Sequence, residues 1–91
     1  MPDGLVAVVK RDCPPCQLTA PVLAAIERAG LPLAVYSQDD PTFPDGVTSV
    51  SDDRPLEVSY RLGIEVVPTL LRVTNGTPDQ RLEGWIEAAR A

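Results

Sequence analysis

The sequence predicts an α/β domain built on a four-stranded mixed β-sheet flanked by helices. An apolar run, Leu5–Val9, leads through a helical pattern to a second strand, Leu33–Tyr36. A helix between two neighbouring strands favours a parallel, right-handed β-α-β unit. The dipeptide Asn75-Gly76 is a strong hairpin signal and makes the last two strands antiparallel. With 91 residues and 44% hydrophobic content, we expect a single domain over residues 1–91.

The first helix is expected to begin at Cys13 or Pro14, because proline suits the first helical turn. Gly30 should end it, and Pro21 should kink it. Apolar residues that recur about every fourth position should face the sheet, namely Leu18, Val22, Ile26 and Ala29.

The second half of the chain predicts a short helix, two strands and a last helix. The short helix spans Arg54–Leu62, with Leu56, Tyr60 and Val58 directed inward. The other three elements are strands at Val66–Val73 and Gln80–Glu83 and a helix at Trp85–Ala91. That last helix has only about two turns, which leaves open that the chain is the N-terminal part of a longer protein.

Ser37–Asp53 is the irregular part of the sequence. It carries five Asp, two Pro and one Gly, and no Lys or Arg. A connection of this length in a small domain is either functional or mobile. Two interpretations remain open: a solvated acidic insertion, or an adaptor that selects partners by charge.

The overall charge argues against two classes of partner. Lys and Arg number 8 against 13 Asp and Glu, a net charge of -5, so we expect binding to neither nucleic acid nor anionic membrane. The start, Met1–Gly4, lacks the basic region of a signal peptide, and Leu5–Val9 is too short to span a membrane. We therefore expect a cytoplasmic monomer, in a compartment where thiols are kept reduced.

Cys13 and Cys16 are the candidate site. Two thiols at this spacing on a first helical turn can close a small disulfide ring and so carry two electrons. The free N–H groups and the dipole of the helix favour a thiolate at Cys13. A zinc site is disfavoured because the chain has no other Cys and no His. A metal or iron–sulfur cluster shared between two chains, two inert thiols and a structural disulfide remain as alternatives to thiol–disulfide exchange without a cofactor.

Three stretches carry a resemblance to a known family. They are Cys13–Leu23 with its proline five residues after the second cysteine, Tyr60–Leu71 with Val67-Pro68-Thr69, and Asn75-Gly76 followed by Gly84. Together they resemble the active-site helix, the cis-proline strand and the hairpin of the thioredoxin superfamily. The resemblance covers almost all of the chain outside Ser37–Asp53, and it implies a thioredoxin-like fold.

The resemblance also implies roles. Cys13 would be an exposed nucleophile that attacks a protein disulfide, and the more buried Cys16 would resolve the mixed disulfide. Pro68 would follow a cis peptide bond, and the Val67 backbone would pair with the substrate strand. The implied substrate-binding residues are Val67, Pro68, Pro14 and Pro15. Electrons would come from an external reductase or from glutathione.

Three departures from the family pattern affect the expected chemistry. Ala7 stands where thioredoxins usually have a buried acid, and Asp12 stands in place of the usual tryptophan. Pro14 and Pro15 lack the N–H groups that could support a Cys13 thiolate, which predicts a weaker oxidant and hence a protein-disulfide reductase. The alternative is a thioredoxin-like binding or scaffold domain of a larger protein, without turnover.

Overall fold

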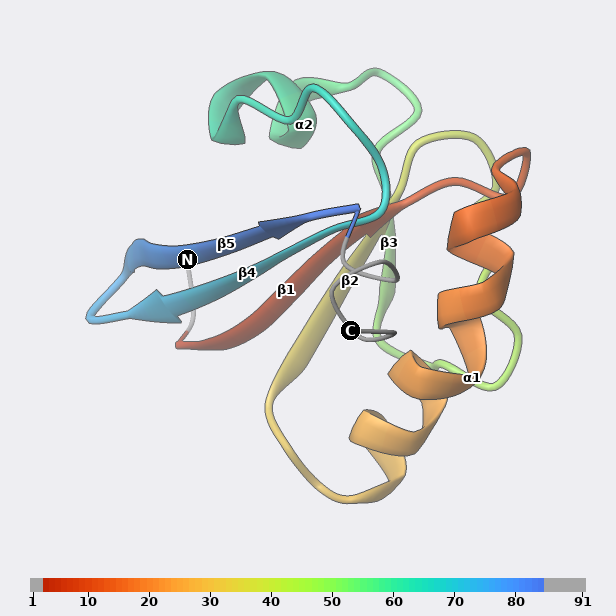
Figure 1. Ribbon diagram of the computed structural model, residues 1–91, viewed down its shortest axis with the longest axis horizontal. Coiled ribbons are helices and arrows are strands. Elements are labelled where there is room, and N and C mark those ends of the chain that lie inside the picture. The colour runs from red at the N-terminus through yellow and green to blue at the C-terminus, as the bar shows by residue number, and fades with distance from the viewer. Residues whose placement is uncertain (1–2, 85–91) are drawn as a thin grey trace.

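A computed structural model describes residues 3–84 as a mixed α/β arrangement of one five-stranded sheet and two helices (Figure 1). In chain order, the elements are β1 (Gly4–Val9), α1 (Pro14–Arg28), β2 (Leu33–Ser37), β3 (Val50–Asp52), α2 (Glu57–Leu62), β4 (Thr69–Thr74) and β5 (Thr77–Glu83). The strand order in the sheet is β3-β2-β1-β4-β5. The predicted last helix, Trp85–Ala91, lies outside the described residues.

The central strand is β1, which pairs in parallel with β2 and antiparallel with β4. The predicted parallel pair around a helix is thus confirmed. The antiparallel hairpin of β4 and β5 is confirmed as well. Its turn residues, Asn75 and Gly76, have φ angles of 54° and 77°. Positive φ at both positions is what a tight hairpin turn of this kind requires.

The prediction of four strands is wrong, because a fifth, β3, lies inside the segment predicted to be irregular. It pairs in parallel with β2, with Val50 opposite Val35. The N–H of Val35 donates to the Ser49 carbonyl (3.1 Å), and the N–H of Asp53 donates to the Ser37 carbonyl (2.8 Å). A three-residue strand is too short to show a hydrophobic period, and its Asp disfavours a strand. Pairing with the edge of β2 therefore stabilises β3, rather than the propensity of its own residues.

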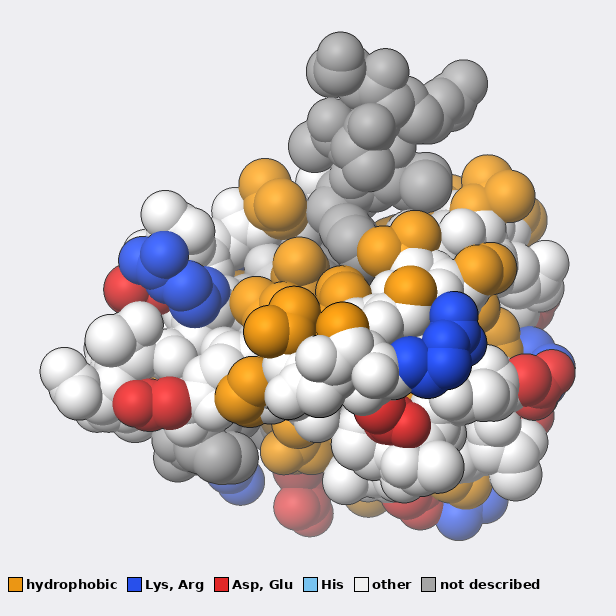
Figure 2. Space-filling view, turned by 90° about the horizontal axis from the view of Figure 1, so that it is seen from below, with side chains coloured by type: hydrophobic (Ala, Val, Ile, Leu, Met, Phe, Trp, Pro, Cys, Tyr) orange, Lys and Arg blue, Asp and Glu red, His pale blue; other side chains and the backbone are white. Residues whose placement is uncertain are grey.

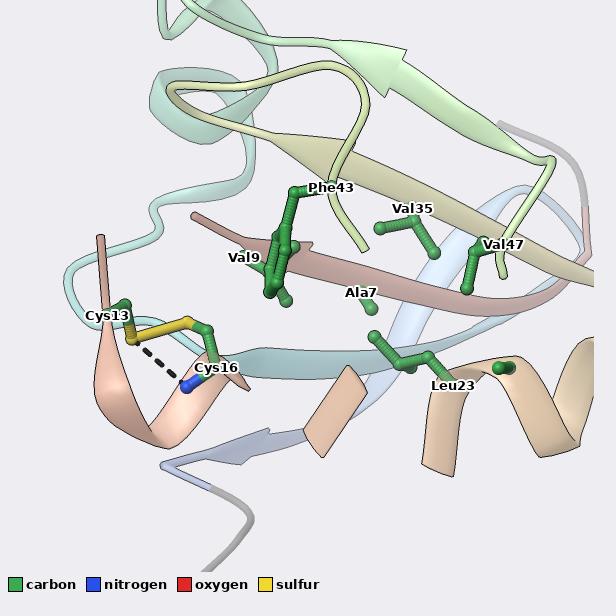
Figure 3. Packing of buried hydrophobic residues seen from close by; sticks show 9 residues of the cluster. Ala7, Val9, Cys13, Cys16, Leu23, Val35, Phe43 and Val47 are labelled. Atoms are coloured by element: carbon green, nitrogen blue, oxygen red, sulfur yellow. Dashed lines mark hydrogen bonds between the residues drawn. A yellow bond between two sulfur atoms is a disulfide. The ribbon is translucent and has the colours of Figure 1, made fainter. Parts of the chain in front are cut away.

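The apolar core lies on both faces of the sheet. On one face, α1 packs its Leu23 and Ala24 against Ala7, Val9 and Val35 (Figure 3). On the other face, Val6, Leu71 and Val73 pack against residues in and just after α2, namely Leu62 and Ile64. This division follows from the alternation of side chains along β1, in which Val6 and Ala7 point to opposite faces.

The prediction of which face of α1 points inward is wrong. The buried face is rotated about the helix axis by roughly one residue from the predicted one. Leu18 and Val22 are 64% and 41% exposed. The residues that α1 buries are Cys16, Thr19, Leu23 and Ala24. The buried cysteine sets this rotation, since positions three, seven and eight residues after Cys16 share its face. Thr19, the polar residue among these four, has its hydrogen-bond partner within the helix, because its hydroxyl donates to the Cys16 carbonyl at 2.8 Å. Pro21 lies inside α1 without ending it.

The predicted inner face of α2 is also wrong, since Tyr60 is 89% and Leu56 is 46% exposed. The side chain that α2 buries is Ser59. Its N–H and hydroxyl both donate to the Asp53 carboxylate, at 2.9 and 2.6 Å, and the N–H of Val58 donates to the second oxygen at 2.9 Å. A polar anchor therefore fixes which side of this short helix faces inward, and an apolar pattern cannot reveal such an anchor.

Candidate functional site

Cys13 lies at the point where β1 gives way to α1. Its backbone is extended, with φ -160° and ψ 103°, and Pro14 and Pro15 occupy the first two helical positions. Proline disfavours helical backbone in the residue before it and suits the start of a helix, so the sequence itself places Cys13 at the helix cap. Cys13 and Cys16 form a disulfide, with their Cα atoms 5.2 Å apart (Figure 3).

One backbone N–H of α1 is directed at the Cys13 sulfur. The N–H of Cys16 lies 3.2 Å from Cys13 Sγ, and the next one, that of Gln17, donates to the Cys13 carbonyl at 3.0 Å. Pro14 and Pro15 offer no N–H, as the sequence predicted. In the reduced protein, a Cys13 thiolate would therefore be stabilised by the Cys16 N–H and by the helix dipole.

A segment 54 residues away in the sequence lies against this sulfur. The carbonyl oxygen of Val67 is 3.7 Å from Cys13 Sγ. The peptide bond between Val67 and Pro68 is cis, as the resemblance implied. Pro68 is buried, and its carbonyl accepts the N–H of Gly84 at 2.8 Å. The Thr69 hydroxyl donates to the Val66 carbonyl at 2.7 Å, which ties this turn together.

The expected exposure of Cys13 is wrong in degree, although the order of the two cysteines is as expected. Cys13 is 6% exposed and Cys16 is 0% exposed. Cys13 is covered because it packs in one apolar cluster with Phe43 and has the Val67 carbonyl beside its sulfur. The remaining predicted substrate-binding residues, Pro14 and Pro15, are exposed next to it.

Ala7 on β1 stands where the resemblance implies a buried acid, and within residues 3–84 no carboxyl group takes that place. Ala7 is fully buried among apolar residues of the cysteine cluster. Within residues 3–84, the buried carboxyl group is that of Asp53, which is bound to the N-terminal end of α2. The sulfur of Cys16 therefore lies in apolar surroundings.

The acidic loop after β2 reaches the turn before Cys13, which the sequence did not reveal. The two carboxylate oxygens of Asp39 accept the N–H groups of Arg11 (2.7 Å) and Asp12 (3.0 Å). The Arg11 guanidinium lies 2.5 Å from the Asp40 carboxylate and 5.1 Å from the centre of the Phe43 ring. Arg11 is thus engaged by the loop.

Two carboxyl groups of this loop are held in the ionised form. Hydrogen bonds from the Thr42 hydroxyl and N–H, and then from Arg11, lower the pKa of Asp40 to about 2. Partial burial would raise the pKa of Asp39, but the N–H groups of Asp12 and Arg11 outweigh it and bring that pKa below its usual value. Both side chains therefore carry full negative charge at neutral pH.

The same loop is anchored in the core, so the interpretation of Ser37–Asp53 as a purely solvated insertion is wrong. Phe43 and Val47 are buried in the cluster that contains both cysteines (Figure 3). Phe43 is the one phenylalanine of the sequence. A lone aromatic residue within an acidic, proline-containing stretch was the signal that could have located this anchor.

Three further observations concern the surface, metal binding and the helices. Figure 2 shows apolar side chains gathered on one face, with charged side chains around them. In the part of the chain that the structure describes, no three or more Cys, Asp and Glu residues are grouped so as to hold a metal ion. Neither of the two described helices combines the length and apolar character that crossing a membrane requires. Comparison with models of known protein families and with curated protein sequences finds no match to this chain.

Proposed function

We propose that this chain is a thioredoxin-like thiol–disulfide oxidoreductase that reduces protein disulfides through Cys13 and Cys16. The observation that carries the proposal is the position of the Cys13 sulfur. It lies at the first turn of α1, 3.2 Å from the Cys16 N–H and 3.7 Å from the Val67 carbonyl. A sulfur pair at such a place can accept and donate two electrons without a cofactor.

The reaction runs in two exchange steps. In the reduced protein, the Cys13 thiolate attacks a substrate disulfide, so that a Cys13–substrate disulfide forms and one substrate sulfur leaves as a thiolate that takes up a proton. Cys16 then loses its proton and attacks Cys13 Sγ, which closes the Cys13–Cys16 disulfide and releases the second substrate sulfur. The substrate gains two electrons and two protons, and an external dithiol reductase or two molecules of glutathione return them to the protein.

The backbone before Pro68 supports binding of an extended substrate segment. Val67 lies outside the ladder of β4, which begins at Thr69, and it is only half-buried. Within residues 3–84, its N–H donates to no protein acceptor. A substrate strand that pairs with this backbone would bring its sulfur to Cys13 and would be recognised mainly through main-chain groups. The exposed Pro14 and Pro15 would flank it.

A second candidate function is a thioredoxin-like binding domain without turnover. Two observations favour it: Cys13 is only 6% exposed, and Ala7 offers no acid to accept the proton of the fully buried Cys16. In that case the cysteines would engage one fixed partner. The cytoplasmic location remains a prediction under either function.

Reduction of insulin by dithiothreitol separates the two candidates. An oxidoreductase should accelerate the appearance of the insulin B-chain precipitate over the reagent alone, and Cys13→Ser should abolish the acceleration. Thr19→Ser is a matched control, since it changes a neighbouring side chain of α1 and keeps the hydroxyl that donates to Cys16. A wild-type protein that gives no acceleration would favour the binding domain.

A further inference from the structure

Asp39 holds the backbone directly before the redox cysteine pair. Its Oδ1 accepts the N–H of Arg11 at 2.7 Å and its Oδ2 accepts the N–H of Asp12 at 3.0 Å. Both carboxylate oxygens are thus committed to the two peptide groups that precede Cys13. The two N–H dipoles point at Asp39 and are not available to a sulfur anion.

Arg11 is the basic residue nearest to Cys13 in the sequence, and acidic residues of the same loop neutralise its charge. The Arg11 side chain forms ion pairs with Asp40 at 2.5 Å and with Asp45 at 3.5 Å. It also lies over Phe43, which packs in the cysteine cluster. The Arg11 side chain is therefore directed toward the loop, where two carboxylates compensate its positive charge.

We propose, building on the function proposed above, that Asp39 is a positioning residue that fixes the Arg11–Asp12 turn and disfavours the thiolate form of reduced Cys13. A fixed negative charge close to a thiol raises the free energy of the thiolate relative to the neutral thiol. Asp39 thereby opposes the Cys16 N–H and the dipole of α1, which both favour the thiolate.

Other charged groups near the sulfur do not play this part. The first turn of α1 contains no acidic residue. Asp12 and Glu65 are exposed, as Asp39 is, but within residues 3–84 neither of their side chains makes a hydrogen bond, whereas that of Asp39 is fixed by two. The charged residues on the segments around Cys13 are Lys10, Arg11 and Asp12 from the turn, Asp39, Asp40 and Asp45 from the loop, and Glu65 from the segment before β4. Among them, Asp39 is the residue that binds the adjacent backbone with both of its oxygens.

The consequence for the proposed reaction is a bias toward electron donation. A less stabilised thiolate makes the reduced form less stable relative to the disulfide, so the pair becomes a better reductant. Fewer Cys13 thiolates at neutral pH also slow the first attack. Asp39 would thus set how strongly this chain reduces its substrates, without touching them.

Alkylation of Cys13 by iodoacetamide, measured against pH, tests this directly. The background is Cys16→Ser, which leaves Cys13 as the single thiol. Asp39→Asn removes the charge and has a similar shape, but it keeps only one of the two acceptor oxygens, because its NH2 group replaces the other and cannot accept the second N–H. It should lower the pKa of Cys13 and raise the alkylation rate near pH 7 about two- to threefold, and the difference should shrink in high salt.

The matched control is Asp79→Asn, which removes an equal charge. Asp79 pairs with Arg72, which lies opposite Leu5 at the beginning of β1, whereas Cys13 follows the other end of that strand. The control should leave the alkylation profile unchanged. Asp39→Ser, a second neutral acceptor, should reproduce the rise, so the test does not depend on one variant folding.

An alkylation profile of Asp39→Asn and Asp39→Ser that matches the parent protein, or that moves to higher pH, would overturn the role of Asp39. Alkylation needs no protein substrate and no turnover. A wild-type protein that fails to reduce insulin would therefore remove the proposed function, while the alkylation profiles would still decide whether Asp39 acts on Cys13.

Discussion

Thr48 donates both its backbone N–H and its hydroxyl to the carboxylate of Glu27, at 2.9 Å each to Oε1. Ser49 donates its N–H and hydroxyl to Oε2, at 3.1 and 2.8 Å. One glutamate near the end of α1 thus ties down the segment that leads into β3. These bonds, led by the Thr48 N–H and the Ser49 hydroxyl, lower the pKa of Glu27 from 4.5 to about 2.

Glu27→Gln should remove a pH-dependent part of the stability. The folded-state pKa lies below the unfolded value, so the carboxylate stabilises the fold fully above about pH 4.5 and loses this effect as pH falls toward 2. The gap in melting temperature between wild type and Glu27→Gln should therefore be largest near neutral pH and should narrow across that window. Differential scanning fluorimetry at a series of pH values measures it.

The control for that series is Glu65→Gln, because Glu65 is exposed and makes no hydrogen bond within residues 3–84. The difference in melting temperature between Glu65→Gln and wild type should stay small at every pH. If the difference in melting temperature between Glu27→Gln and wild type remained constant from pH 7 to pH 2, the ionised carboxylate would not be the source of the stabilisation.

Asp53→Ala should destabilise the fold by about 2–4 kcal/mol, because it leaves the buried donors of Ser59 and the partly buried N–H of Val58 without an acceptor. The Asp53 side chain is 1% exposed, so water cannot replace the carboxylate without opening the loop. Urea unfolding followed by circular dichroism gives the free energy of unfolding. Asp52→Ala, at the exposed neighbouring position, should change it little, and equal losses for the two variants would show that the network around Ser59 is not what holds α2.

Leu23→Ala and Leu18→Ala should differ sharply, although both truncate a leucine of α1. Leu23 is 0% exposed, and its truncation should cost about 2–5 kcal/mol. Leu18 is 64% exposed, and its truncation should stay within about 0.5 kcal/mol. Urea unfolding of the pair tests the rotation of α1 directly. A larger loss of unfolding free energy for Leu18→Ala than for Leu23→Ala would instead support the inward face that the hydrophobic spacing predicted.

Cys16→Ser should convert the protein into a trap for its substrates. Without a resolving thiol, Cys13 would retain the substrate as a mixed disulfide, which non-reducing gels followed by mass spectrometry of the captured partners can identify. The double variant Cys13→Ser, Cys16→Ser provides the control and should capture nothing. Capture that persists in the double variant would mean that the adducts do not depend on Cys13.

The order of the elements and the location of the cysteines could be predicted because each rests on a local signal. The run Leu5–Val9, the prolines after Cys13 and the Asn75-Gly76 turn each dictate the backbone within a few residues. Pro68 could be placed near Cys13 only through the family resemblance, since that contact spans 54 residues.

Several of the errors arose because contacts distant in the sequence overrode local apolar spacing. Asp53 turned α2 so that Ser59 is buried and Tyr60 is exposed. Asp39 joined the acidic loop to the cysteine turn through backbone N–H groups, which are present at every residue and leave no mark in a sequence. The strand β3 likewise depends on a neighbour, β2, and not on its own composition.

The packing of Phe43 beside both cysteines has a practical consequence. As the sole phenylalanine of the sequence, it would give one unambiguous set of aromatic proton resonances. Those resonances should move when the sulfur pair gains or loses electrons, since the ring lies in the same cluster. Nuclear magnetic resonance of this one ring could therefore follow the oxidation state of the protein in solution, without labels and without a substrate.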